Sequence, residues 1–302
     1  MRVRDLIDEQ FVVRLAKSGA LILDVDDTLL ARRGGSSESG ETFADSEAAR
    51  LLPDLAKCGI YVALVTGHGL GQLSQRLLDP LAIELTPVQS VSGFAGPVVY
   101  ANRGAIRLEF VDGVFVRTAA NGERFEIGEG NRRELAAIAK EIYPVGDKEP
   151  VLELRDGVIL SMRPFSEEAR RIAIGSGRQL LKEAGLDVSF EMIAAGKSTI
   201  EVSVCGLTKS VACTDLLASI SRKRALPPEQ VEAASLMIGD EFGEGGNDRV
   251  VADEFPLMTC ISVTKAVSES PSKNVLEMSD LSGFPSTKAA AVILRQILET
   301  IG

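Results

Sequence analysis

The stretch Ala20–Leu30, with the sequence ALILDVDDTLL, constrains the fold of this chain more than any other. Apolar residues lead into three carboxylates, Asp24, Asp26 and Asp27, and apolar character resumes after Thr28. A run that is apolar on both faces predicts a buried strand of a parallel sheet. Carboxylates at its end are costly to bury unless a cation or hydrogen bonds compensate them. We therefore expect a strand whose carboxyl end carries chemistry.

Asp24 and Asp26 stand two residues apart, so beyond the end of the strand both carboxylates can turn toward one point. Hard oxygen ligands of this kind suit Mg²⁺. The pattern also fits a strand followed by an Asp-rich turn that binds no metal. A metal site at this strand end is our first expectation.

A second buried strand is predicted over residues 60–66, whose sequence IYVALVT is apolar almost throughout. Between the two strands, residues 46–58 have apolar residues at helical spacing after a polar start, although Pro53 interrupts the pattern. Strand, helix and strand in this order predict a parallel α/β sheet. Ligands bind at the carboxyl ends of such strands, so Thr66 would share one crevice with the aspartates. Thr66 fits equally well as the cap of a helix that begins near Leu70.

The turn after Thr66 continues with Gly67 and His68, and His68 is the only histidine of the chain. A histidine in such a strand-to-helix turn is either a local turn or capping group or a contact to substrate. The sequence leaves both roles open.

From about Pro97 the sequence alternates between apolar and polar residues, which is typical of antiparallel strands. Asp-Gly pairs at 112–113 and 156–157 are hairpin signals between β-like runs. Helical stretches over residues 131–143 and about 166–184 follow these hairpins, and the runs DVSFEMI and STIEVSV close the block. We predict an inserted α+β domain whose antiparallel sheet has helices on one face. The parallel pattern then returns, so the first domain is interrupted.

Two features of the returning half suit a phosphate and a metal. Thr208 is placed to cap a helix, and Lys209 would project from a helix start whose amides already favour an anion, although many such lysines are merely solvated. The strand-like run SLMIG ends just before Asp240, which would add a third carboxylate. The acidic, Gly-rich loop that follows reaches Asn247 and Asp248. A calcium loop is the competing interpretation, but the ligand spacing of a helix-flanked Ca²⁺ loop is absent.

The composition excludes several classes of function. With 302 residues, of which 45% are hydrophobic and 25% charged, the chain is expected to be globular. Four cysteines without a metal or redox spacing indicate reduced thiols in a cytoplasmic compartment. The N-terminal sequence lacks the apolar segment of a signal peptide, and no run approaches the roughly 18 apolar residues of a membrane span. A net charge of −10 disfavours nucleic acid and anionic membranes as partners.

Four segments together resemble the motifs of the haloacid dehalogenase-like (HAD) phosphotransferase superfamily. They are DVDDT at 24–28, the strand-end Thr66, Lys209, and GDEFGEGGND at 239–248. The insertion between the second and third motifs resembles the type IIB α+β cap of the subgroup that contains sugar phosphatases and eukaryotic-type phosphomannomutases. The resemblance implies a Rossmann-like parallel-sheet core formed by residues 1–110 and 205–302. Residues 111–204 would form the cap that sets substrate specificity.

The resemblance also implies a role for each motif residue. Asp24 would attack phosphorus and form an aspartyl phosphate, and Asp26 would protonate the leaving oxygen and later deprotonate water. Mg²⁺ would be held by Asp24, the main-chain carbonyl of Asp26, and Asp240. Thr66 and Lys209 would bind the phosphoryl oxygens. Residues expected to orient these groups without touching substrate are Thr28, Asn247 and Asp248.

Similarity to the phosphomannomutase branch suggests residues that bind substrate. DVDDTLLARR is similar to that branch's DVDGTLTPAR, ELRDGVILS to its EFRNGMLNVS, and STIEVSVCGLTK to a form like ISFDVFPDGWDK. The substrate-binding residues implied are Arg33, Gly67, Arg155, Thr199 and Glu201. Two departures stand out: Asp27 replaces the family's glycine, and the branch's later cap arginines have no clean match here.

These departures favour a phosphatase over a mutase, because a mutase needs a firm cationic site for a second phosphate. We therefore expect a Mg²⁺-dependent phosphatase that hydrolyses a small phosphorylated metabolite, with a sugar phosphate as the expected class. A phosphohexomutase of the phosphomannomutase type is the alternative, and a nonenzymatic interaction protein on the same fold is the third. The antiparallel sheet of the cap would offer an edge or a face through which two copies could pair, so a homodimer stays open.

Overall fold

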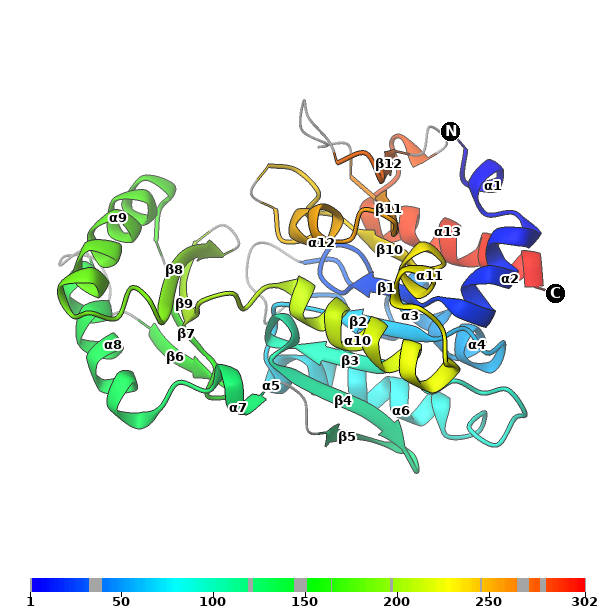
Figure 1. Cartoon of the computed structure of the whole chain (residues 1–302), viewed down its shortest axis with the longest axis horizontal. Helices are drawn as coiled ribbons and strands as arrows, with labels where there is room; N and C mark the ends of the chain where they lie inside the picture. The colour runs from blue at the N-terminus through cyan, green and yellow to red at the C-terminus, as the bar shows by residue number, and fades with distance from the viewer. Residues whose placement is uncertain are drawn as a thin grey trace. The chain divides into compact units, whose positions relative to one another are not determined.

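The chain divides into two compact units in the computed structural model (Figure 1). The core unit comprises Met1–Ala119 and Thr208–Gly302, and the inserted unit comprises Ala120–Leu207. The structure describes residues 2–32, 40–118, 122–143, 151–163, 165–195, 198–244, 246–264, 272–277 and 281–301. Within these residues no helix is long and apolar enough to cross a membrane.

An eight-stranded sheet forms the centre of the core unit in the described residues, with the strand order β12-β11-β10-β1-β2-β3-β4-β5. The strands from β12 to β3 run parallel, and β4 and β5 are added antiparallel at one edge. The bounds are β1 Leu21–Asp24, β2 Val62–Val65, β3 Val98–Ala101, β4 Ile106–Val111, β5 Val114–Thr118, β10 Leu236–Gly239, β11 Thr259–Ser262 and β12 Val275–Glu277. All four residues of β1 are buried, as expected for a strand that is apolar on both faces.

Helices flank this sheet in the order expected for a doubly wound α/β fold. Their bounds are α1 Val3–Leu6, α2 Glu9–Ser18, α3 Glu47–Arg50, α4 Leu52–Lys57, α5 Leu70–Leu73, η2 Ser74–Leu78, α6 Asp79–Leu85, η3 Asn102–Gly104, α10 Lys209–Arg224, α11 Pro228–Ala233, α12 Arg249–Glu254 and α13 Ser286–Ile301. Ile22 of β1 and Val65 of β2 pack with Leu216 of α10 in one buried cluster. Helix α13 packs against α2 and α3, and Figure 1 shows α10 in front of the strands.

The helix predicted over residues 46–58 is divided into α3 and α4, which meet at Leu51. Ser46 begins α3 as expected, because its hydroxyl accepts a hydrogen bond from the Ala49 amide at 3.1 Å. Pro53 lies in the first turn of α4, where its missing N–H is tolerated. The proline therefore determines where the second helix starts.

The inserted unit contains an antiparallel sheet with the strand order β6-β7-β9-β8 in its described part. Its elements are α7 Gly122–Phe125, α8 Glu129–Ile142, β6 Val151–Arg155, β7 Ile159–Arg163, α9 Glu167–Glu183, β8 Phe190–Ala195 and β9 Thr199–Val204. Apolar side chains that alternate along the strands, such as Met162 and Val202, pack with Leu135 of α8 and Leu181 of α9. A Rossmann-like core with a separate α+β unit is thus the fold that the sequence predicted.

The first predicted hairpin lies in the core sheet, whereas we expected it in the inserted domain. Its turn forms as predicted, because Asp112 and Gly113 both have positive φ, of 49° and 87°. Strand β4, however, pairs with β3 of the core, with Leu108 opposite Val99. Alternation of apolar residues specifies a strand and a buried face, but it does not specify the neighbouring strand.

Candidate active site

A buried lysine bridges two aspartates at the carboxyl end of β1. Asp24 is the last residue of β1, and Lys209 is the first residue of α10. The Lys209 ammonium nitrogen lies 2.7 Å from Asp24 Oδ1 and 2.7 Å from Asp248 Oδ1, and only 4% of the lysine is exposed. Charges that are removed from water in this way need close partners, and here each has one.

Thr208 stands at the N-cap position of α10, but its side chain makes no capping hydrogen bond. Its hydroxyl is instead hydrogen-bonded to the Ser210 hydroxyl at 2.6 Å. The predicted capping bond is therefore wrong, although the helix begins where expected. Lys209 is held at the helix start by its two ion pairs.

Asp240 and Asp248 lie beside Asp24 because β10 is the parallel neighbour of β1. Ligand oxygens of these three aspartates lie within 4.8 Å of one another. Asp248 Oδ2 accepts a hydrogen bond from the Glu241 amide at 2.9 Å, and a Cβ on Gly239 would lie 2.3 Å from that oxygen. Gly239 therefore permits this close approach.

The acidic cluster has the donor set of a hard divalent cation. Asp240 Oδ1 is buried and has no hydrogen-bond partner among the described residues. Asp248 already binds Lys209 and the Glu241 amide, so Asp24 and Asp240 have the greater capacity for a cation. Carboxylate oxygens that converge from strand ends fit Mg²⁺ chemically.

The pKa values reflect the crowding of negative charge. Burial raises the pKa of Asp24 to about 7, with the charges of Asp248 and Asp26 adding to it and Lys209 opposing it. Burial, and then the charges of Asp24 and Asp248, raise the pKa of Asp240 to about 9. Burial would lower the pKa of Lys209, but its two aspartates outweigh burial and raise it. A cation bound here would displace protons from the two carboxyls.

Asp26 and Thr66 meet at the same edge of the sheet. Thr66 follows β2, and its hydroxyl donates a hydrogen bond to Asp26 Oδ2 at 3.3 Å. The same hydroxyl accepts from the His68 amide at 3.1 Å, and the N-cap residue of α5 is Gly69. Thr66 therefore does not cap α5, and of its two predicted placements the structure shows the one beside Asp26.

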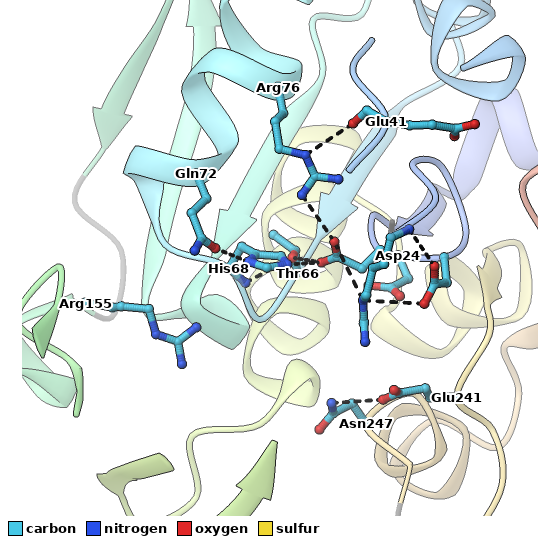
Figure 2. Close-up of polar contacts among 12 residues, drawn as sticks. Asp24, Glu41, Thr66, His68, Gln72, Arg76, Arg155, Glu241 and Asn247 are labelled. Atoms are coloured by element: carbon cyan, nitrogen blue, oxygen red, sulfur yellow. Dashed lines mark hydrogen bonds and ion pairs between the residues drawn. The ribbon is translucent and has the colours of Figure 1, made fainter. Parts of the chain in front are cut away.

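Three further side chains with basic groups surround the Asp26 carboxylate. Two of them, His68 and Arg76, are labelled in Figure 2. His68 Nε2 lies 2.6 Å from Asp26 Oδ2, Arg76 Nη1 lies 3.6 Å from Oδ1, and Arg32 Nε lies 4.0 Å from Oδ1. Burial raises the pKa of Asp26, but His68 and the two arginines outweigh burial, so the pKa is lowered. The contacts of His68 and Arg76 to Asp26 were missed from the sequence, where His68 in the turn was the only signal.

Comparison with solved structures shows similar folds at low identity. An N-terminally truncated, IMP-bound IMP-nucleotidase of Plasmodium falciparum is 13% identical, with a TM-score of 0.61. The match covers 97% of this chain and 71% of the nucleotidase chain. A trehalose-6-phosphate phosphatase of Aspergillus fumigatus is 14% identical, covers 97% of this chain and 98% of its own, and has a TM-score of 0.57. A trehalose-6-phosphate phosphatase related protein is 15% identical, and its match covers 93% of this chain and 97% of the related protein, with a TM-score of 0.53. No protein-family model and no curated protein matches the sequence.

The chain shares the fold of these solved structures. The core sheet of this fold, interrupted by an α+β unit, agrees with the resemblance seen in the sequence motifs. The family to which the motifs point stays a prediction.

Asp27, which replaces the glycine of the HAD motif, adopts the left-handed backbone conformation with a φ of 54°. Asp is one of the few non-glycine residues that tolerate this region. Its Oδ1 accepts a hydrogen bond from the Arg32 amide at 2.8 Å, and its Oδ2 lies 3.5 Å from Arg32 Nε. The backbone therefore accommodates Asp27 in place of glycine, and the Asp27 carboxylate holds Arg32.

The other predicted residues of the core unit have the following places in the structure. Thr28 is fully buried, and its hydroxyl has no hydrogen-bond partner in the described parts of the chain. Asn247 donates to Glu241 Oε2 at 3.0 Å rather than to the neighbourhood of Lys209. Gly67 is half-buried, and a Cβ built on it would contact nothing within 4 Å. Arg33 lies outside the described residues.

Three predicted substrate-binding residues belong to the inserted unit. Arg155 at the end of β6 forms an ion pair with Glu201 of β9, and both side chains are largely buried. Thr199 begins β9 and is half-buried. By strand alternation Arg155 and Glu201 lie on the sheet face opposite the apolar residues Leu154 and Ile200, which pack with α8 and α9.

Proposed function

We propose that the chain is a Mg²⁺-dependent phosphatase that hydrolyses a small phosphorylated metabolite through an aspartyl phosphate. The observation that carries the proposal is the buried Lys209, which lies 2.7 Å from both Asp24 and Asp248 beside the half-buried Asp240. A lysine, a strand-end carboxylate and an acidic cluster at one point are the groups that phosphoryl transfer requires. The likeness of fold to proteins named as a nucleotidase and as phosphatases supports it.

In the first step an Asp24 carboxylate oxygen would form a bond to phosphorus as the bond from phosphorus to the leaving oxygen breaks. The pKa of Asp26 is lowered in the free protein, so this carboxylate would have to take up a proton as the phosphate dianion binds. Asp26 would then transfer that proton to the leaving oxygen, and the alcohol would depart. Lys209 and the Thr66 hydroxyl would donate hydrogen bonds to the phosphoryl oxygens. The result is an aspartyl phosphate on Asp24 and a carboxylate on Asp26.

In the second step water would attack the phosphorus, and Asp26 would take the proton of that water. The bond between phosphorus and Asp24 breaks, which releases inorganic phosphate and restores both aspartates. Asp24, Asp240 and the main-chain carbonyl of Asp26 would hold Mg²⁺, which when bound offsets the repulsion between the carboxylates and the phosphate dianion. Asp248 would keep Lys209 in place through their ion pair.

The expected substrate class is a sugar phosphate, and the inserted unit would supply its specificity. Arg155, Thr199 and Glu201, with Arg33 and Gly67 of the core unit, are the proposed contacts. A phosphohexomutase is the weaker candidate, because a mutase needs a cation in the cap that is available for a second phosphate. The guanidinium of Arg155 is already paired with Glu201.

Phosphate release from hexose, pentose and triose phosphates and from nucleoside monophosphates, measured with Mg²⁺ and with EDTA, tests the proposal. We expect metal-dependent release that Asp24→Asn abolishes, whereas Arg133→Ala, at a strongly exposed position, changes nothing. Each sugar phosphate is also examined for isomerisation after a hexose bisphosphate is added. Isomerisation with little release would favour the mutase, and release that survives Asp24→Asn would refute the proposed nucleophile.

A further inference from the structure

We propose that His68 and Arg76 are positioning residues that hold the Asp26 carboxylate from two sides. The inference rests on the proposed function, in which Asp26 carries the proton to and from the reacting oxygens. His68 contacts Oδ2 at 2.6 Å, and Arg76 approaches Oδ1 at 3.6 Å. The two oxygens of one buried carboxylate are thus engaged by different side chains.

The His68 ring is fixed by contacts on both of its nitrogens and on its backbone. Its Nδ1 is hydrogen-bonded to the Gln72 amide oxygen (Figure 2), and its Nε2 lies against Asp26 Oδ2. The His68 amide donates to the Thr66 hydroxyl at 3.1 Å, and the His68 carbonyl accepts from the Asn102 amide at 2.9 Å. A ring held in this way presents its Nε2 at one place before substrate arrives.

Arg76 is held independently of His68. It lies in η2, a single π-helical turn, and such turns occur frequently at functional sites. Its Nε donates to the Glu41 carbonyl at 3.2 Å, and its own carbonyl accepts from the Phe43 amide at 2.8 Å. A Cβ on Gly40 would lie 2.5 Å from the guanidinium, so the chain passes closely over it. Arg76 is thereby directed at Asp26 by its own helix and by residues 40–43.

The consequence for the proposed reaction is a fixed orientation of the acid–base carboxylate. An unrestrained aspartate can rotate its carboxyl group and direct either oxygen toward the leaving group. With Oδ2 in contact with His68 at 2.6 Å and Oδ1 facing the Arg76 charge at 3.6 Å, that rotation would weaken an interaction on each side. A misplacement of a catalytic group by about 1 Å can slow a reaction about 10²-fold. Loss of this restraint on Asp26 should therefore be measurable as a slower chemical step.

Two substrates of similar shape isolate this effect. Phenyl phosphate has a poor leaving group that needs protonation, whereas p-nitrophenyl phosphate has a good one that does not. We expect His68→Leu to slow single-turnover phenol release about tenfold or more and p-nitrophenol release by less than about threefold. The substrate concentration that gives half of the maximal rate should stay unchanged. His68→Gln should recover part of the phenol rate, because its amide can still donate to the carboxylate. Arg76→Met should show the same selective loss.

Three controls separate the possible failures. Asp24→Asn must abolish release of both leaving groups, and if it does not, or if wild-type protein shows no Mg²⁺-dependent release, the proposed function fails and this inference falls with it. Thermal melting of each variant identifies loss of folding, and His68→Gln then replaces His68→Leu as the decisive variant. Equal losses on both substrates, or no loss on either, would overturn the positioning role while leaving the proposed function intact.

Discussion

Lys209 Nζ lies 2.7 Å from Asp24 Oδ1 and at the same distance from Asp248 Oδ1, although 185 residues separate Lys209 from Asp24 in sequence. Helix α10 begins at Lys209 after the whole inserted unit, and it packs on the strand that Asp24 ends. The pair therefore links the two segments of the core at the proposed catalytic site.

Replacing Lys209 should strongly destabilise the protein. In Lys209→Met, Asp24 and Asp248 would remain buried without their cation, and removal of one partner from a buried ion pair typically costs about 3–5 kcal/mol. Urea unfolding in EDTA would measure the loss, and phosphate release should also disappear. The matched control is Lys17→Met at an exposed position, whose free energy of unfolding should stay within about 0.5 kcal/mol of wild type. A Lys209→Met protein as stable as Lys17→Met would contradict the buried bridge.

Stability of the metal-free protein should fall as pH rises. The pKa of Asp24 is raised to about 7 and that of Asp240 to about 9, whereas unfolded aspartates titrate near 4. The folded protein keeps protons that the unfolded chain has lost, so the free energy of unfolding decreases from about pH 4 to about pH 9. Mg²⁺ would replace those protons, so its effect on Tm should grow over the same window.

Thermal melting with and without Mg²⁺ at about pH 5.5 and about pH 8.5 tests this pH dependence. Asp240→Asn removes one of the two carboxyls, so it should flatten the pH dependence of the metal-free protein and reduce the effect of Mg²⁺. A Mg²⁺ effect that is equal at both pH values would show that the two carboxyls do not exchange protons for the metal.

Gly239→Ala should perturb the acidic cluster from the backbone. The added Cβ would lie 2.3 Å from Asp248 Oδ2, so Asp248 would have to move away from Lys209 and the Glu241 amide. We expect a loss of about 1–3 kcal/mol in the free energy of unfolding and weaker Mg²⁺ binding. Gly71→Ala is the control, because a Cβ there meets nothing within 4 Å. Because Gly71 lies in helix α5, this substitution should raise the free energy of unfolding by up to about 1 kcal/mol.

Asp27 should tolerate glycine better than alanine. Asp27→Ala places a Cβ with no polar group at a φ of 54° and loses the hydrogen bond to the Arg32 amide, so we expect a loss of about 1–2 kcal/mol. Asp27→Gly loses the same hydrogen bond but relieves the backbone strain, which should recover about 1 kcal/mol. Denaturant unfolding of the two variants separates the contributions. Equal stability of both would show that the left-handed conformation is not imposed on this residue.

Much of the candidate site could be anticipated because its residues terminate regular elements. Asp24, Thr66 and Asp240 follow apolar runs, and Lys209 opens a helix. The carboxyl ends of neighbouring parallel strands meet at one edge, so the strand pattern alone indicates that such residues converge. Their catalytic and metal-binding roles stay predictions.

Three features could not be predicted from where elements end: the sheet that β4 and β5 join, the missing cap at Thr208, and the side chains around Asp26. Each depends on which partner a group meets in three dimensions: β3 beside β4, Ser210 beside Thr208, and a π-helical turn that directs Arg76 at Asp26. By itself the sequence determined the buried strands, the interrupted α/β core and the polar strand ends, because periodicity and strand-end chemistry are local. Only the tertiary structure decided strand neighbours, side-chain partners and the direction of each charge, because these follow from packing between segments far apart in the chain.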